Sequence, residues 1–543
     1  MQDLSYIPVN REYHLDEYCF TISIYTFSNV YTIPEDACVI EHEGSLTAES
    51  TQLLWAGGQE RVNGKFRLCA RKTSAGIRIR IFAEMERSVD VIRRVKLSVL
   101  HLEKGEIVNS IDVARRNIGE SGLLIHYPEA WRESATPLVV MKKTDGYYYF
   151  RSRDNLVRDK VFAFVPERDG RVTAELIHEE QAVCFSSRIE VPEWEIAVCG
   201  SVEEAYREHI QEITKSYGFV KWEERKDVPV WLKNVSLVAA IHGQHWTGHI
   251  FNDYAAMLKA AQRLSEKIDP SKVLLYLPGW EGRYYWQYGD YRPDVRMGGP
   301  EGFARLIDGA HALGMHVMPM FGMNVVATHL SDYRRWGEPS RVTSASGNRN
   351  EGSVDWDGSR HFDHASNVSV HPGAPQWKNR FCDQVRELVD DYGFDAVFLD
   401  IMARWRNDPN GDYYEGVKQM VERIHLDHPQ LLISGEGWYD ALTALTPLVQ
   451  CGHTDGRMHY PDTAYPPMLD PYMRGFAHLS LGDPAFLSTG VHEQGRNPEW
   501  KTPLTKGILP TVTIVDGTLD AAPERVDEII AQAEEYYGRF IGK

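Results

Sequence analysis

Two carboxylic acids occupy positions from which the chain could carry out nucleophilic or acid–base chemistry. Asp400 ends the apolar run VFLD (397–400), and Glu436 ends the run LISGE (432–436). An acid that directly follows apolar strand residues is costly to bury unless it is paired or used. Asp400 and Glu436 are therefore candidate catalytic residues, with a structural, ion-paired role as the alternative. Arg404 lies close enough to Asp400 to orient it and keep it ionised.

The spacing of the two acids indicates the chemistry that they could share. The segment between them accommodates one helix with its loops, so their strands should be neighbours. Carboxyl groups that end adjacent barrel strands can lie about 5–6 Å apart, which is the separation typical of retaining glycoside hydrolysis. In that mechanism one carboxylate attacks the sugar, and the other acid protonates the leaving oxygen. Burial and the neighbouring negative charge would raise the pKa of this second acid.

The elements that must position these acids form a repeating pattern from about residue 230 onwards. Continuous apolar runs alternate with amphipathic helices, which predicts a parallel sheet that is covered on both sides. Eight such units predict a (β/α)₈ barrel, whose catalytic face lies at the carboxyl ends of its strands. A doubly wound open sheet is the alternative, but no glycine-rich phosphate motif follows any strand. The predicted strands are 235–243, 272–280, 315–324, 394–402, 430–438, 448–456, 475–483 and 508–517.

The first 200 residues show a different pattern. Short runs that alternate apolar and polar residues, separated by turn signals, predict an antiparallel β-sandwich; the clearest are 19–27, 76–84, 95–103, 137–143, 146–152 and 172–178. The segment 201–218 predicts a helix, with Ser201 as its cap and Glu204 at the capping-box position. The predicted domains are therefore a sandwich at 1–200, a linker helix at 201–229 and a catalytic barrel at 230–543.

The composition argues against several classes of protein. The net charge of −18 makes nucleic acid a poor partner, because phosphate binding needs a basic field. The seven cysteines are scattered and form no CxxC pair, which argues against a disulfide framework and a zinc site. We predict no metal and no cofactor. Because no apolar run approaches a membrane span and no signal-peptide core is visible, we expect a cytoplasmic protein without a membrane partner.

Aromatic and polar residues near the predicted strand ends are candidates for sugar binding. The loop 280–294 is dense in aromatic residues and predicts a sugar platform, with packing against the sandwich as the alternative. Polar residues at other strand ends could hold sugar hydroxyl groups. The predicted substrate-binding residues are His242, Trp246, Trp280, Trp286, Asp290, Asn324, Arg404, Trp438, His453, Asp455 and His492.

The barrel segment resembles the retaining α-glycosidases that carry Asp on strand four and Glu on strand five, such as the α-amylase and endo-α-N-acetylgalactosaminidase families. FDAVFLDIM (394–402) resembles their nucleophile strand, and ISGEGW (433–438) resembles their acid/base strand. The resemblance implies that Asp400 is the nucleophile and Glu436 the acid/base. One departure is Phe398, where the α-amylase pattern has Arg. In the α-galactosidase and α-glucosidase families the acid/base is an Asp further along, a role that Asp455 could fill.

The sequence therefore predicts a glycoside hydrolase that cleaves an α-linked oligosaccharide or glycoside with retention. The acids themselves indicate glycoside hydrolysis, and the α linkage is implied by the resemblance alone. A transglycosidase would use the same residues. One alternative is a non-catalytic carbohydrate-binding barrel, which needs the aromatic loop but neither acid. Another is a metal-dependent barrel hydrolase or lyase, which needs three or more ligands at the strand ends.

Overall fold

The chain folds into two compact units. The computed structural model describes residues 10–542 except for 56–57, 59, 87–90, 110–116, 129–132, 246, 284, 350–366, 451–468 and 481–503. The described residues up to Tyr217 form the first unit, and those from Gly218 onwards form the second. Among the helices of the described residues, none is both long enough and apolar enough to cross a membrane.

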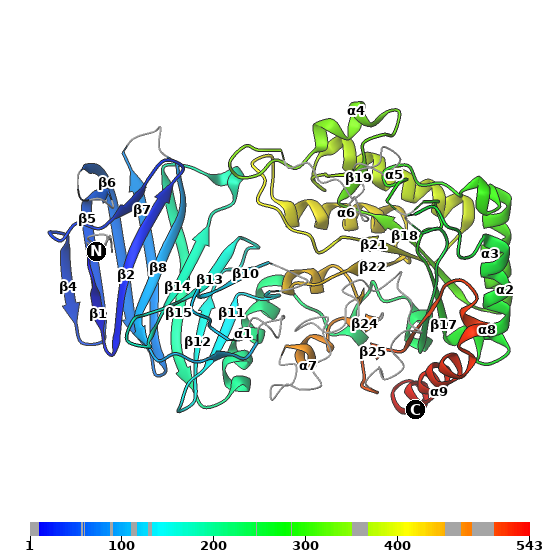
Figure 1. Ribbon diagram of the computed structural model, residues 1–543, viewed down its shortest axis with the longest axis horizontal. Helices are drawn as coiled ribbons and strands as arrows, with labels where there is room; N and C mark the ends of the chain where they lie inside the picture. Colours follow the sequence, from blue (N-terminus) through cyan, green and yellow to red (C-terminus); the bar gives the residue numbers. More distant parts are fainter. Residues whose placement is uncertain are drawn as a thin grey trace. The chain divides into compact units, whose positions relative to one another are not determined.

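The first unit is an antiparallel sheet of fifteen strands followed by helix α1 (Val202–Tyr217) (Figure 1). Its hydrogen-bonded path runs β10-β13-β14-β8-β2-β3-β5-β6-β7-β15-β12-β11-β9, with β1 paired to β2 and β4 paired to β5. The six strands predicted most clearly from the sequence correspond to β2, β7, β8, β11, β12 and β14. The strands are β1 (Tyr13–Leu15), β2 (Tyr18–Thr26), β3 (Val30–Thr32), β4 (Cys38–His42), β5 (Ser45–Trp55), β6 (Arg61–Lys72), β7 (Gly76–Met85), β8 (Ile92–Leu102), β9 (Glu106–Ile107), β10 (Leu123–Tyr127), β11 (Leu138–Lys142), β12 (Tyr147–Ser152), β13 (Lys160–Pro166), β14 (Val172–Glu179) and β15 (Arg188–Cys199).

This sheet folds over so that its two ends pack face to face. Phe162 on β13 packs edge-on against Trp194 on β15, with ring centroids 5.8 Å apart. Phe150 on β12 packs against Phe164 on β13, with centroids 5.5 Å apart. Strand β13 lies near one end of the hydrogen-bonded path, whereas β12 and β15 lie near the other. The apolar core therefore lies between two layers, as in a sandwich, but backbone hydrogen bonds connect those layers into one continuous sheet.

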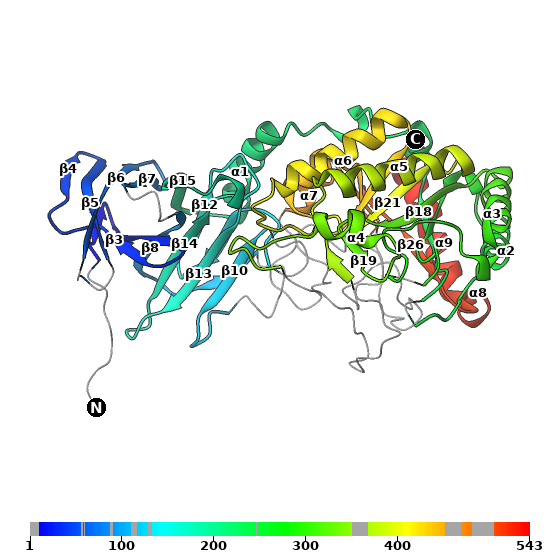
Figure 2. The same cartoon turned by 90° about the horizontal axis from the view of Figure 1, so that it is seen from above.

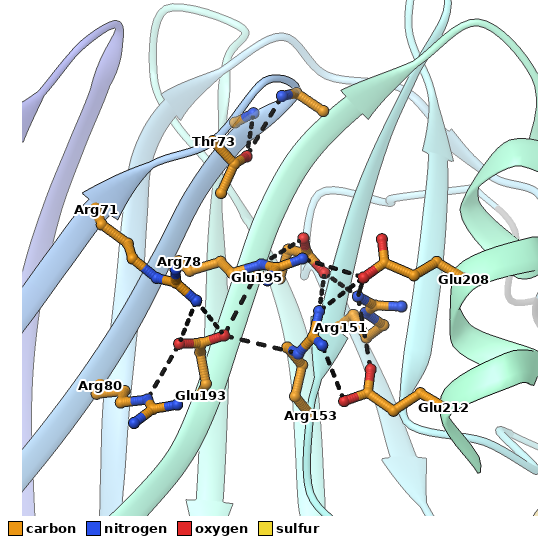
Figure 3. A network of polar contacts seen from close by, with 12 residues as sticks. Arg71, Thr73, Arg78, Arg80, Arg151, Arg153, Glu193, Glu195, Glu208 and Glu212 are labelled. Atoms are coloured by element: carbon orange, nitrogen blue, oxygen red, sulfur yellow. Dashed lines mark hydrogen bonds and ion pairs between the residues drawn. The ribbon is translucent and has the colours of Figure 1, made fainter. Parts of the chain in front are cut away.

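A network of arginine and glutamate side chains joins helix α1 to strands β12 and β15 (Figure 3). Arg151, whose side chain is 1% exposed, bonds to Glu195 and lies 3.0 Å from Glu208 of the helix. Arg153 contacts the same helix through Glu208 at 2.9 Å and Glu212 at 3.1 Å. Because a charge is expensive to bury without an opposite charge, the network fixes the helix against this part of the sheet.

The second unit is built on a parallel sheet whose hydrogen-bonded path returns to its start. The path runs β25-β24-β23-β22-β21-β18-β17-β16-β26. Strands β25 (Ile508–Leu509) and β26 (Thr511–Ile514) are separated only by Pro510, which has no N–H to donate. Strand β25 pairs with β24, and β26 pairs with β16. One interrupted strand therefore joins the seventh strand to the first, and the described residues form an eight-stranded parallel barrel.

The remaining strands of the barrel lie within the ranges predicted from the sequence, and helices cover its outside (Figures 1 and 2). Asp253 caps α2 by accepting the Ala256 N–H at 2.8 Å. The strands are β16 (Leu237–Ile241), β17 (Val273–Leu277), β18 (His316–Gly322), β21 (Ala396–Asp400), β22 (Leu432–Glu436), β23 (Leu448–Gln450) and β24 (His478–Ser480); β19 (Val325–Ala327) and β20 (Asn367–Ser369) form a separate pair. The helices are α2 (Tyr254–Ser265), α3 (Gly299–Leu313), α4 (Tyr333–Trp336), α5 (Pro375–Tyr392), α6 (Tyr413–Asp427), α7 (Asp470–Met473), α8 (Thr518–Ala521) and α9 (Pro523–Phe540).

The substitution Arg151→Met is expected to destabilise the first unit by about 3 kcal/mol, because it breaks a buried ion pair. This is the low end of the usual range, since Arg78 still bonds to Glu195 at 2.8 Å. The control is Arg80→Met, because the Arg80 side chain is 70% exposed and its ion pair should contribute about 0–1 kcal/mol. Hydrogen exchange of peptides from β12 and β15, followed by mass spectrometry, measures both effects. Equal exchange in the two variants would contradict a stabilising role for the buried network.

Candidate active site

Asp400 and Glu436 end adjacent parallel strands, so the barrel brings the two carboxyl groups together. Leu399 of β21 pairs with Gly435 of β22, which places the following residue of each strand at the same edge. The Asp400 side chain is buried, and that of Glu436 is half-buried. A hydrogen bond links the two carboxyl groups. The two groups therefore interact directly, as expected for acids that end neighbouring barrel strands.

The backbone after Asp400 is strained in a way that positions Glu436. Ile401 has a φ of 62°, in the left-handed region that a β-branched residue rarely adopts. In this conformation its N–H donates to Glu436 Oε2 at 3.0 Å. The Ala403 N–H donates to the Glu436 carbonyl oxygen at 3.1 Å. Backbone strain of this kind persists where the surrounding structure enforces it, and here it holds one carboxyl group in place.

Tyr288 holds the other carboxyl group. Its hydroxyl donates to Asp400 Oδ2 at 2.5 Å. The phenol ring lies against Gly322, the residue that pairs with Asp400 across β18 and β21. A Cβ atom at position 322 would lie 2.1 Å from the Tyr288 ring, so only glycine at this position leaves room for the ring. Tyr291 fixes the same strand end, because its hydroxyl donates to the Gly322 carbonyl at 2.6 Å.

Burial and negative charge control the protonation of this site. The pKa of Asp400 lies well above its ordinary value, first because of burial and second because of the charge of Glu436. The hydrogen bond from Tyr288 opposes this shift and is outweighed. Burial likewise raises the pKa of Glu281 to about 8. The site therefore retains protons at a pH at which exposed carboxyl groups would all be ionised.

The prediction that Arg404 keeps Asp400 ionised is wrong. The Arg404 guanidinium donates to Ser369 Oγ at 3.0 Å and forms no ion pair with Asp400. Between the two residues the chain passes through the left-handed conformation of Ile401, whose φ is 62°.

The aromatic residues predicted to form a sugar platform are mostly part of the core. Trp280 is fully buried, and its indole N–H donates to the Met320 carbonyl at 2.8 Å. Trp438 is also buried, and its indole N–H donates to Thr443 Oγ1 at 2.9 Å. In the ligand-free protein these two indole rings therefore pack inside the barrel unit, and each satisfies its N–H there. Trp286 is half-buried against His329, with ring centroids 4.2 Å apart.

The polar candidates have varied positions. Asn324 is buried, and its side-chain amide donates to the Ile401 carbonyl at 3.1 Å, next to the strained turn. His242 is buried at the end of β16, with its ring centroid 5.1 Å from that of Phe251. Asp290 is half-buried and forms an ion pair with Arg292. Four predicted residues lie outside the described ranges: Trp246, His453, Asp455 and His492.

Two residues of the site were not singled out from the sequence as site residues. Tyr288 was recognised only as one aromatic residue among several in the loop 280–294, and Glu281 only as part of that loop. The available signal for Glu281 was its place directly after Trp280, at the carboxyl end of the second predicted strand. In the first unit, the side chains of Glu12, His14 and Cys19 lie close enough together to hold a metal ion. Those of Glu12 and His14 are exposed.

Comparisons with known proteins identify a shared fold. A family model described as a domain of unknown function (DUF6259) matches residues 192–416, which include Asp400. No curated protein matches the sequence. The α-N-acetylgalactosaminidase NagBb from Bifidobacterium bifidum is similar in structure, with a TM-score of 0.65, 13% identity, and coverage of 97% of this chain and 93% of that chain.

Two α-galactosidases share the architecture at similarly low identity. The enzyme TtGalA from Thermus thermophilus has a TM-score of 0.53 at 12% identity, covering 90% of this chain and 99% of that chain. The GH36 enzyme AgaA from Geobacillus stearothermophilus has a TM-score of 0.50 at 13% identity, covering 97% of this chain and 74% of that chain. The likeness supports a fold in which an antiparallel β domain precedes a parallel α/β barrel, as the sequence predicts.

The substitution Gly322→Ala is expected to destabilise the protein by about 1–3 kcal/mol, because the added methyl group overlaps the buried Tyr288 ring. A crystal structure of the variant should show the Tyr288 hydroxyl displaced from Asp400. Gly538→Ala in helix α9 is the matched control, since its added Cβ meets nothing within 4 Å and should stabilise the helix by roughly 0.5–1 kcal/mol. Unchanged thermal stability in Gly322→Ala would show that the ring does not depend on this glycine.

Asp400→Asn is expected to raise the free energy of unfolding at pH 7 by about 1–3 kcal/mol. The pKa of Asp400 is raised in the folded state, so its contribution to stability is complete below its unfolded pKa of roughly 3.9 and is lost as the pH rises. The gain from the substitution should therefore shrink toward zero near pH 4. Calorimetry between pH 4 and 8 measures it, with the exposed Asp308→Asn as control. A destabilised Asn variant at pH 7 would contradict the shift.

Proposed function

We propose that this protein is a glycoside hydrolase that cleaves an α-glycosidic bond with retention of configuration. The observation that carries the proposal is the pair of carboxyl groups, Asp400 and Glu436, in contact at the carboxyl ends of adjacent barrel strands. Chemistry on this barrel takes place at that edge. The α linkage is supported by the solved structures of similar fold, whose names describe α-galactosidases and an α-N-acetylgalactosaminidase.

In the proposed reaction the two acids divide one proton between them. In the ligand-free protein Asp400 retains the proton, and Glu436 accepts the N–H of Ile401. When the sugar enters, the proton moves from Asp400 to Glu436 along the hydrogen bond that joins them. Asp400 is then ionised and can attack the anomeric carbon, while protonated Glu436 faces the leaving oxygen.

The remaining steps follow from this arrangement. Asp400 forms a bond to the anomeric carbon as the bond to the leaving oxygen breaks, and Glu436 gives its proton to that oxygen. Glu436 then takes a proton from a water molecule, which attacks the same carbon and releases Asp400. The hydroxyl of Tyr288 donates to Asp400 throughout and stabilises its charge as a leaving carboxylate. A sugar acceptor in place of water would make the protein a transglycosidase.

The substrate proposed is a neutral glycoside or oligosaccharide. The structures of similar fold include NagBb in complex with GalNAc and TtGalA in complex with stachyose. The net charge of −18 agrees with a neutral ligand and disfavours an anionic one. Asp455, which lies outside the described residues, stays the alternative acid/base.

Asp400→Asn is expected to lower kcat at least ~10³-fold on whichever aryl α-glycoside the wild type cleaves, because it removes the nucleophile. Glu436→Gln should lose less activity on aryl glycosides with good leaving groups than on an unactivated oligosaccharide, since only the latter needs a general acid. A panel of 4-nitrophenyl α- and β-glycosides, with Asp308→Asn as control, measures both. Proton NMR of the first product anomer tests retention.

Two outcomes would contradict parts of the proposal. Equal activity of wild type and Asp400→Asn would make Asp400 a structural residue and place the chemistry elsewhere. If Asp400→Asn is inactive and Glu436→Gln retains full activity on unactivated substrates, the acid/base assignment passes from Glu436 to another residue, with Asp455 the next to be substituted.

A further inference from the structure

Glu281 is a buried carboxyl group that the proposed reaction does not use. It directly follows Trp280 in the loop after β17, at the edge of the barrel where Asp400 and Glu436 also lie. Its side chain is 2% exposed, and neither carboxyl oxygen has a hydrogen-bond partner of good geometry; the one donor that acts on the carboxylate is its own backbone N–H. Buried polar groups are almost always hydrogen-bonded, so an acid with two unpaired oxygens indicates a missing partner.

The groups that face Glu281 are acidic or neutral. Its charge acts on Asp400 and on the hydroxyl groups of three buried tyrosines, and the carboxylate of Asp294 acts on it in turn. Asp294 is itself paired with Arg296 at 3.1 Å. The tyrosines are Tyr254, Tyr276 and Tyr291. The groups that influence Glu281 thus include no cation that would compensate its charge, and its pKa is raised to about 8 by burial.

Glu281 and Asp400 both lie at the carboxyl edge of the barrel, where a sugar held by the catalytic pair would bind, and the charge of Glu281 acts on Asp400. A carboxylate offers two oxygens that accept hydrogen bonds, and adjacent hydroxyl groups on a sugar ring offer two matching donors. Hydrogen bonds to a charged acceptor are stronger than those between neutral groups, so such a ligand would favour the ionised form. A polyol would therefore satisfy both unpaired oxygens at once.

We propose that Glu281 is a substrate-binding residue that accepts hydrogen bonds from two adjacent hydroxyl groups of the sugar held at Asp400. This inference rests on the proposed function and adds to it the part of the substrate that is recognised. In the ligand-free protein Glu281 is a neutral carboxylic acid. When the sugar binds, the O–H bond of Glu281 breaks, the proton passes to the solvent, and two sugar hydroxyl groups donate to the carboxylate.

The proton released by Glu281 provides the first test. The Asp400→Asn variant binds without turnover, and the ligand is the 4-nitrophenyl glycoside that wild type cleaves. Titration calorimetry at pH 7 in phosphate and in Tris, which differ in ionisation enthalpy, counts the protons released. We expect close to one proton in Asp400→Asn, since a group of pKa about 8 is mostly protonated at pH 7. The double variant Asp400→Asn with Glu281→Gln should release at least ~0.5 proton fewer.

Affinity and substrate selectivity provide the second test. Glu281→Gln keeps the volume of the side chain, and Glu281→Met removes its hydrogen bonds altogether. Both should weaken binding at least ~10-fold, and the loss should be smaller for a monodeoxy glycoside that lacks one of the two hydroxyl groups. Glu301→Gln, at a residue whose side chain is 92% exposed, is the matched control.

Each outcome decides between the two proposals. If wild type cleaves a glycoside and the Glu281 variants keep its affinity and proton release, the role of Glu281 is refuted and the proposed function stands. If wild type neither cleaves nor binds any member of the panel, both fall together. A third outcome is that the Glu281 variants lose proton release but still distinguish the deoxy glycoside from the parent glycoside as well as the protein with Glu281 does. Glu281 would then titrate on binding without contacting these hydroxyl groups, and the inference would be wrong.

Discussion

The placement of two carboxyl groups in contact at the ends of adjacent strands is the constraint on which this face of the barrel depends. Acids that lie this close in a buried setting repel one another unless they share a proton and accept hydrogen bonds. The surroundings supply both conditions. The hydroxyl of Tyr288 reaches Asp400 only because Gly322 leaves space for its ring, and the N–H of Ile401 reaches Glu436 only in a strained conformation. The glycine at 322 and the strained backbone at Ile401 are therefore both needed to provide the hydrogen bonds that the two acids accept.

Much of the architecture could be predicted from the sequence because its physical causes are local. A strand that is buried on both faces must be a continuous apolar run, and eight such runs appear at the right intervals. The acids at 400 and 436 could be located for the same reason, since a strand end is visible as the point where the run stops. Ser201 was also predictable as a helix cap, because its hydroxyl accepts the Glu204 N–H three residues ahead, at 3.3 Å.

The features that could not be predicted depend on directions that no short segment encodes. The side chain of Trp280 points into the core and that of Trp286 lies half-exposed, although both come from one aromatic loop. Arg404 was expected to face Asp400 because of its spacing, but the chain between them passes through a residue with a positive φ. The continuity of the first sheet is likewise invisible, because alternation identifies strands without identifying their neighbours.

The pairing of the last barrel strand with the first has a consequence during synthesis of the chain. Residues 511–514 supply the partner of β16, which is made more than two hundred residues earlier. While the ribosome is still translating the segment between them, β16 has an unpaired edge that can accept a strand from another chain. The closing contact is also among the most distant in sequence, and such contacts form late. A nascent chain would therefore need protection from aggregation at this seam until Ile514 has emerged.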